Sequence, residues 1–122
     1  MKNELNENEL FILQYLWENG PKTFADIMQE INYVLKKDWK KQTINTYLLR
    51  LKKKGYLGAT KKDNRATYFP TITSDEYYEK YAKNIINTTF NGSLKQFISC
   101  FSGGKHINDA EKKELIEYIK DL

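Results

Sequence analysis

Residues 41–71 decide the predicted fold, and they read KQTINTYLLRLKKKGYLGATKKDNRATYFPT. Apolar side chains recur at helical spacing from Gln42 to about Lys54, which predicts an α-helix. The predicted inward residues of this helix are Ile44, Tyr47, Leu48 and Leu51. Gly55 follows, and glycine readily adopts the left-handed conformation that ends many helices. The helix is therefore expected to end just before Gly55.

The rest of this stretch has the composition of β-strands. Residues 56–62 and 66–71 are two short β-prone runs, and the polar segment 63–65 between them predicts a turn. Lys61, Lys62 and Arg65 make this hairpin basic. A helix followed directly by a basic hairpin is typical of the second half of a winged helix-turn-helix domain.

Two further helices are predicted before this stretch. A capping box of Asn6 with Glu9 opens the first one, and Gly20-Pro21 ends it. The second begins near Thr23, and its predicted inward residues are Ile27, Ile31 and either Val34 or Leu35. Three helices and a hairpin predict a winged helix-turn-helix domain over residues 1–72, in which the third helix reads DNA and the hairpin is the wing.

Residues 73–122 contain three more amphipathic helices and have no predicted strand. A capping box begins the first of them at Thr73, residues 108–111 cap the last, and Asn91-Gly92 separates the first from the second. Helices this short bury little apolar surface without a partner, so we expect a dimerisation region, most simply for a two-fold homodimer. The residues assigned to its interface are Tyr78, Tyr81, Ile85, Ile86, Phe90, Leu94, Phe97, Ile98, Phe101, Leu115, Ile116 and Ile119. The predicted fold class is thus mainly α with a small β-hairpin.

Positive charge is concentrated in one part of the chain. The formal net charge of the 122 residues is +4, whereas residues 36–65 alone have a net charge of +9 and the remainder has −5. A strongly basic segment in an otherwise acidic chain is typical of a surface that binds a polyanion such as DNA. A lysine-rich helix face that is merely solvated is the alternative interpretation.

The outward face of the third helix carries side chains that can both hold and read DNA. Asn, Gln and Arg can pair with base edges in the major groove, while Lys and Thr suit phosphates or single acceptors. The outward positions are Lys41, Gln42, Asn45, Thr46, Leu49, Arg50, Lys52 and Lys53. The residues predicted to bind DNA are Lys40, Lys41, Gln42, Thr43, Asn45, Thr46, Arg50, Lys53, Lys61, Lys62 and Arg65.

Other functional classes have little support in the sequence. Cys100 and His106 are the only cysteine and histidine, and they lack the partners that nucleophilic catalysis or a closed zinc site requires. We predict a buried structural Cys100, a surface His106, no catalytic residue, no metal site and no cofactor. A polar, acidic start and the absence of a long apolar run predict a cytoplasmic protein that does not insert into a membrane.

Three segments resemble the penicillinase-repressor family of the BlaI/MecI type, which also includes the copper-responsive CopY repressors. They are 10–17, 39–57 and 65–70, and they contain Trp39-x-x-x-Thr43 and Arg50-Leu51-x-x-Lys54-Gly55. The resemblance implies a homodimeric winged-helix repressor that occupies a palindromic operator and blocks transcription of a resistance operon. Lys40 stands where the family usually has a small polar residue before the reading helix.

The resemblance also implies a route of induction. In antibiotic-responsive members a membrane sensor-protease system leads to cleavage of an Asn-Phe bond, whose counterpart here is Cys100-Phe101. The copper-responsive members bind their metal through a cysteine-rich tail, which a chain with one cysteine does not match.

The alternative to a sequence-specific repressor is a winged-helix protein-protein interaction module with only non-specific affinity for DNA.

Overall fold

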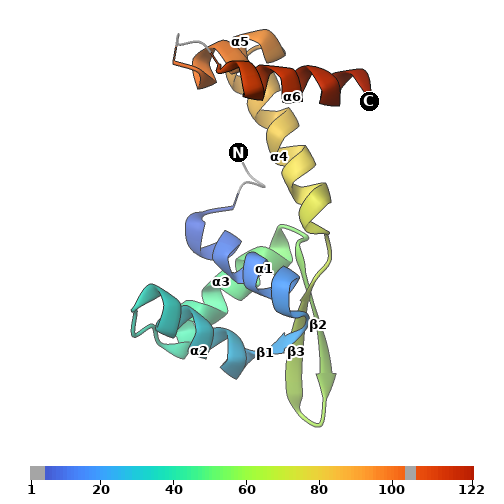
Figure 1. Ribbon diagram of the computed structural model, residues 1–122. Coiled ribbons are helices and arrows are strands. Elements are labelled where there is room, and N and C mark those ends of the chain that lie inside the picture. Colours follow the sequence, from blue (N-terminus) through green and yellow to red (C-terminus); the bar gives the residue numbers. More distant parts are fainter. Residues whose placement is uncertain (1–4, 104–106) are drawn as a thin grey trace. The chain divides into compact units, whose positions relative to one another are not determined.

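The computed structural model describes residues 5–103 and 107–122, and Figure 1 shows its elements. Their bounds are α1 Glu7–Asn19, β1 Lys22–Thr23, α2 Phe24–Leu35, α3 Lys41–Lys53, β2 Leu57–Lys62, β3 Arg65–Pro70, α4 Ser74–Thr89, α5 Leu94–Phe101 and α6 Asp109–Lys120. The chain forms two compact units, one ending at Tyr81 and the other beginning at Ala82. The sequence-based boundary at residue 72 precedes α4, whereas the first unit extends into that helix because Tyr77 is buried there.

The first unit is a winged helix-turn-helix domain, as predicted. Helices α1, α2 and α3 surround one apolar core that the sheet completes. The core residues are Ile12, Leu13, Leu16, Ile27, Ile31, Ile44, Leu48, Leu51, Leu57 and Tyr68. On α2 the partly buried Leu35 packs against this core, while Val34 remains 45% exposed, which decides between the two residues considered for that position.

The sheet differs from the predicted hairpin in two respects. It has a third strand, β1, which pairs with β3 so that the order is β1-β3-β2. The turn comprises only Asp63 and Asn64, whose φ angles of 52° and 64° are those of a two-residue hairpin turn. Arg65 is therefore the first residue of β3, opposite Lys62, and its assignment to the turn was wrong.

The predicted capping boxes are present at the starts of α1 and α4. Asn6 accepts a hydrogen bond from the Glu9 N–H at 2.8 Å, and the Glu9 carboxylate accepts one from the Asn6 N–H at 3.0 Å. At α4, the Thr73 hydroxyl oxygen accepts from the Glu76 N–H at 3.1 Å. These bonds satisfy backbone donors that lack partners within the helix, so the first residue of each of these helices follows from the sequence.

The second unit has little buried apolar surface. Phe90 and Phe97 are half-buried and pack edge to face at 5.4 Å between ring centroids, whereas every residue of α6 is exposed. Asn91 and Gly92 end α4 with positive φ angles, as predicted. The prediction of a buried Cys100 was wrong: Cys100 is exposed, because α5 has no buried residue and only Phe97 and Ile98 are half-buried. His106 lies outside the described residues.

Candidate nucleic-acid interface

The outward face of α3 is the centre of the candidate interface. Ten of the eleven residues predicted to bind DNA are exposed, and Thr43 is half-buried. Ile44, Leu48 and Leu51 are at most 1% exposed on the opposite side of the same helix. Burial of this apolar stripe therefore fixes which side chains α3 presents to solvent.

A clamp in the turn between α2 and α3 positions the start of α3. The Asn32 side chain donates to the Trp39 carbonyl at 3.2 Å and accepts from the Trp39 N–H at 2.9 Å. The Trp39 ring packs against Tyr47 at 5.3 Å between centroids. The turn is therefore anchored to α2 through Asn32 and to α3 through Tyr47. The sequence pattern predicted no role for Asn32.

A second clamp holds the end of α3 against α1. The Lys54 ammonium donates to the two carboxylate oxygens of Glu9 at 2.9 and 3.1 Å. Glu9 is 1% exposed, and it also caps α1 through the Asn6 N–H. The sequence revealed the capping role of Glu9, whereas its partner Lys54 was counted only as part of the basic segment.

The start of α3 is not capped by the side chain of its N-cap residue. Lys40 occupies the N-cap position, and its side chain makes no capping hydrogen bond to the residues that the structure describes. Its ammonium lies 4.0 Å from the exposed carboxylate of Asp38. A helix N-terminus flanked by Lys40 and Lys41 attracts anions, because the helix dipole and both side chains carry positive charge there.

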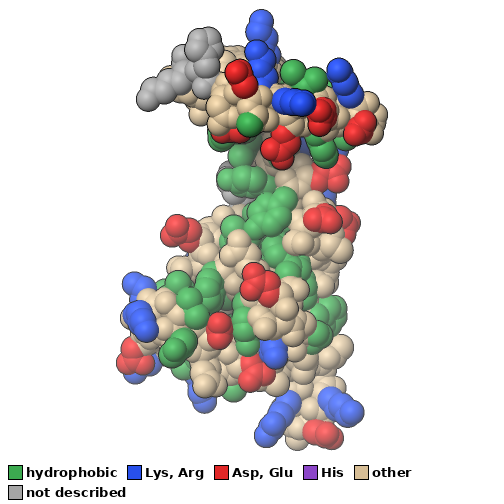
Figure 2. Space-filling view, viewed as in Figure 1, with side chains coloured by type: hydrophobic (Ala, Val, Ile, Leu, Met, Phe, Trp, Pro, Cys, Tyr) green, Lys and Arg blue, Asp and Glu red, His purple; other side chains and the backbone are tan. Residues whose placement is uncertain are grey.

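The hairpin carries the second basic cluster. Figure 2 shows Lys and Arg side chains at the tip of the β2–β3 hairpin, beside one acidic residue. Lys61, Lys62 and Arg65 are exposed there, around the turn residue Asp63. The hairpin thus presents three positive charges to a polyanion.

Arg50 and Lys52 lie at the edges of the exposed face of α3. The Arg50 guanidinium is 6.0 Å from the centroid of the Tyr47 ring, and the Lys52 ammonium is 5.6 Å from that of Tyr68. Both aromatic rings belong to the domain itself, so these contacts orient the cations along the flanks of α3. Cations at such positions are suited to the DNA backbone rather than to base edges.

The residues assigned to dimerisation fall in both units. Tyr78 and Tyr81 belong to the first unit, where the Tyr78 hydroxyl accepts a hydrogen bond from the Gln14 side chain at 2.9 Å. The other ten lie in the second unit. Five of these are exposed, namely Leu94, Phe101, Leu115, Ile116 and Ile119, and five are half-buried, namely Ile85, Ile86, Phe90, Phe97 and Ile98.

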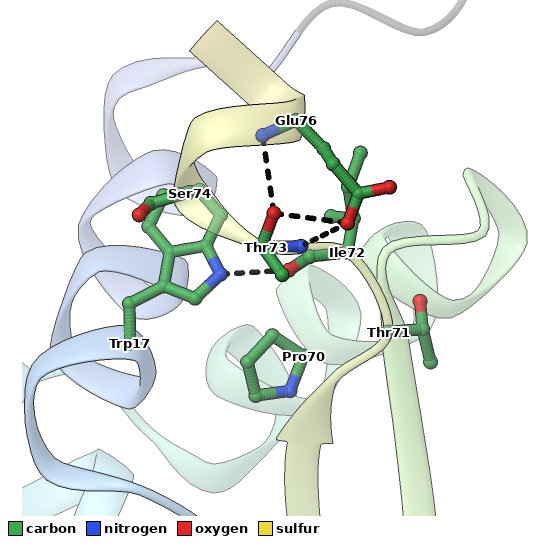
Figure 3. A pocket seen from close by; sticks show the side chains of 7 residues that line it. All are labelled: Trp17, Pro70, Thr71, Ile72, Thr73, Ser74 and Glu76. Carbon is green, nitrogen blue, oxygen red and sulfur yellow. Dashed lines mark hydrogen bonds between the residues drawn. The ribbon is translucent and has the colours of Figure 1, made fainter.

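A pocket beside the start of α4 is lined by Trp17, residues 70–74 and Glu76 (Figure 3). Its polar groups bind one another, since the Trp17 indole donates to the Ile72 carbonyl at 2.8 Å and Thr73 bonds to Glu76. The hydrogen bonds from Thr73 hold the pKa of Glu76 below its ordinary value. The bond from Trp17 therefore joins α1 to the segment before α4, and the bonds between Thr73 and Glu76 cap α4.

A second hollow is lined by Tyr15, Asp26, Gln29, Glu30 and Tyr33. Burial, together with the charges of Glu30 and Asp26, raises the pKa of Tyr15. This hollow is acidic, so it repels phosphate and is not part of a DNA-binding surface.

Among the described residues, no three His, Cys, Asp or Glu side chains come together as metal ligands, and no helix could cross a bilayer.

The domain has a helix-turn-helix packed on an apolar core, a third helix whose outer face is exposed and basic, and a basic wing. These features define the class of winged-helix nucleic-acid-binding domains. Comparison with known proteins identifies the family. The model of the penicillinase repressor family matches residues 5–121, and the chain belongs to this family.

Similar proteins include a penicillinase repressor and a methicillin resistance regulatory protein. The penicillinase repressor of Bacillus licheniformis is 25% identical over 118 residues, which cover 97% of this chain and 91% of that protein. The methicillin resistance regulatory protein MecI of Staphylococcus aureus is 28% identical over 113 residues, covering 92% of this chain and 89% of MecI.

Two solved structures of the repressor BlaI match about three fifths of the chain. The DNA-binding domain of the repressor BlaI is 27% identical with a TM-score of 0.54, and the match covers 63% of this chain and 92% of that one. The monomeric form of Bacillus licheniformis BlaI in complex with the blaP half-operator is 28% identical with a TM-score of 0.51. That match covers 61% of this chain and 88% of the BlaI chain.

Proposed function

We propose that the protein is a transcriptional repressor that binds a palindromic operator as a homodimer and controls a resistance or stress operon. The observation that carries the proposal is the exposed face of α3, where polar side chains able to pair with bases lie between basic ones. Family membership and the similarity to BlaI in complex with a half-operator support the same function.

In this proposal the two ends of α3 have different roles. The N-terminal outward residues Gln42, Asn45 and Thr46 reach base edges, because recognition helices of this class insert their N-terminal part into the major groove. The DNA backbone is contacted by residues at both ends of the helix. These are Lys40, Lys41 and the half-buried Thr43 at its start, and Arg50 and Lys53 further along. The wing residues Lys61, Lys62 and Arg65 contact phosphates or the adjacent minor groove.

The second unit is proposed to join two copies of the chain. The described residues of one copy cover the apolar side chains of α6 only in part, and Leu115, Ile116 and Ile119 are 40%, 44% and 51% exposed. Pairing of these surfaces in a two-fold dimer would remove them from water. Two reading helices related in this way require two inverted half-sites about one helical turn of DNA, or a multiple of it, apart.

Release from DNA is proposed to follow cleavage at Cys100-Phe101 by a sensor-protease system. Both side chains are exposed, and Phe101 is the last residue of α5. A peptide bond in a terminal helical turn can adopt the extended form that a protease binds at a small cost, because helix ends fray.

The experiment compares Asn45→Ala with Lys53→Ala in titrations against operator and scrambled duplexes at fixed salt. Loss of a bidentate base contact affects only the correct base, so Asn45→Ala is expected to cost about 1–3 kcal/mol on operator and much less on scrambled DNA. Lys53→Ala is expected to weaken both complexes alike. Equal losses for Asn45→Ala on both duplexes would instead favour a protein-interaction module with non-specific DNA affinity.

A further inference from the structure

Leu49 is a large aliphatic side chain on the otherwise polar face of α3, and 49% of it is exposed. Successive residues of an α-helix are rotated by about 100°, so Leu49 falls between Asn45 and Gln42 near the middle of that face. The buried residues Leu48 and Leu51 lie on the far side of the helix. If α3 enters the major groove, Leu49 therefore points into the groove.

Single exposed leucines are common on protein surfaces, and a second observation gives this one a function. The Thr46 hydroxyl donates a hydrogen bond to the Gln42 carbonyl within α3 at 2.9 Å. Its proton is thus engaged by the helix itself, so Thr46 presents its methyl group, and no hydroxyl proton, to an outside partner. Thr46 lies one turn before Leu49 on the same face, so the two apolar groups are neighbours.

We propose that Leu49 and the Thr46 methyl group form an apolar contact that recognises the C5-methyl group of thymine in the operator. The thymine methyl is the apolar group that base pairs display in the major groove, and apolar side chains recognise it by removing it from water. The contact would therefore specify a T·A pair in each half-site. This inference rests on the proposed function, since it requires that α3 read DNA.

The test replaces each thymine of the operator in turn with deoxyuridine, which removes only the methyl group. The operator is first obtained by repeated selection of binding sites from random-sequence duplexes. For the unmodified protein, replacement of the contacted thymine should raise Kd about fourfold, the factor that corresponds to burial of one methyl group. Leu49→Ala should bind more weakly, and its Kd should change less than twofold for the same replacement.

Two substitutions of Thr46 separate its methyl group from its hydroxyl. Thr46→Val retains a methyl group and should keep the sensitivity of Kd to deoxyuridine. Thr46→Ser retains the hydroxyl and should lower that sensitivity. Val34→Ala is the matched control, because Val34 is 45% exposed on α2 and should leave operator binding unchanged.

Circular dichroism of each variant verifies that it is folded, which is expected for substitutions of exposed side chains. Equal sensitivity of Leu49→Ala and the unmodified protein to deoxyuridine would overturn the inference, and so would a selected operator whose affinity is independent of every thymine methyl. Failure to select any preferred sequence would overturn the proposed function as well, so the two failures are distinguishable.

Discussion

Lys54→Met is expected to destabilise the protein by about 3 kcal/mol. The substitution removes the ammonium that pairs with Glu9 at 2.9 Å and leaves a carboxylate that is 1% exposed without its counter-ion. Breaking a buried pair in this way costs roughly 3–5 kcal/mol. The Lys54 side chain is 21% exposed, so water screens part of the interaction, and the lower end of the range applies.

Urea unfolding followed by circular dichroism measures this loss, and a thermal scan should show a melting temperature lower by about 10 °C. The matched control is Lys53→Met, which removes the adjacent exposed lysine and should change stability by less than about 0.5 kcal/mol. The double substitution Glu9→Met with Lys54→Met should recover much of the loss, because it leaves no unpaired buried charge. A Lys54→Met protein as stable as the Lys53→Met control would refute the reasoning.

Three further predictions concern the wing, the second unit and α4. Replacement of both Lys61 and Lys62 by Ala should weaken binding to operator and random DNA alike and lower the slope of log K against log salt by roughly 1 to 2, and an unchanged slope would mean that the hairpin does not face DNA. Ile119→Asp should shift the protein toward monomer in sedimentation and lower operator affinity at the same time; an unmodified protein that sediments as a monomer at micromolar concentration would contradict this. The pKa of Glu76 is lowered on folding, so its stabilising effect is present above the ordinary carboxyl pKa of 4.5 and is lost as the pH falls through the folded value. The difference in urea stability between the unmodified protein and Glu76→Gln should accordingly be larger at pH 7 than at pH 3, and a difference independent of pH would show that the Thr73 bonds do not act through this charge.

The sequence predicted the helices well because their signals are local. The capping box of Asn6 with Glu9 and the positive φ of Gly55 each depend on residues a few positions apart. The apolar spacing that buries Ile44 and Leu48 also determines which side of α3 is exposed. The order of elements, and with it the winged-helix class and the residues of the candidate interface, could therefore be read from the chain.

Other features depend on contacts between distant residues. Strand β1 has only two residues, Lys22 and Thr23, and it exists because β3 offers them partners more than forty positions later. Arg65 joined the sheet rather than the turn because Asp63 and Asn64 both accept positive φ, which shortens the turn to two residues. The pairing of β1 has no signal in its own stretch of sequence, whereas Asp63 and Asn64 are a local signal for the two-residue turn.

The sequence by itself determined the helix ends, the basic segment and the face that α3 presents, because hydrogen bonds and apolar periodicity within a few turns set them. Only the tertiary structure decided that Lys54 pairs with Glu9, 45 positions away, whereas its neighbours Lys52 and Lys53 are exposed. It likewise decided that the Cys100 thiol is exposed. Burial and charge pairing depend on which surfaces meet when the chain folds, and a linear pattern does not record that.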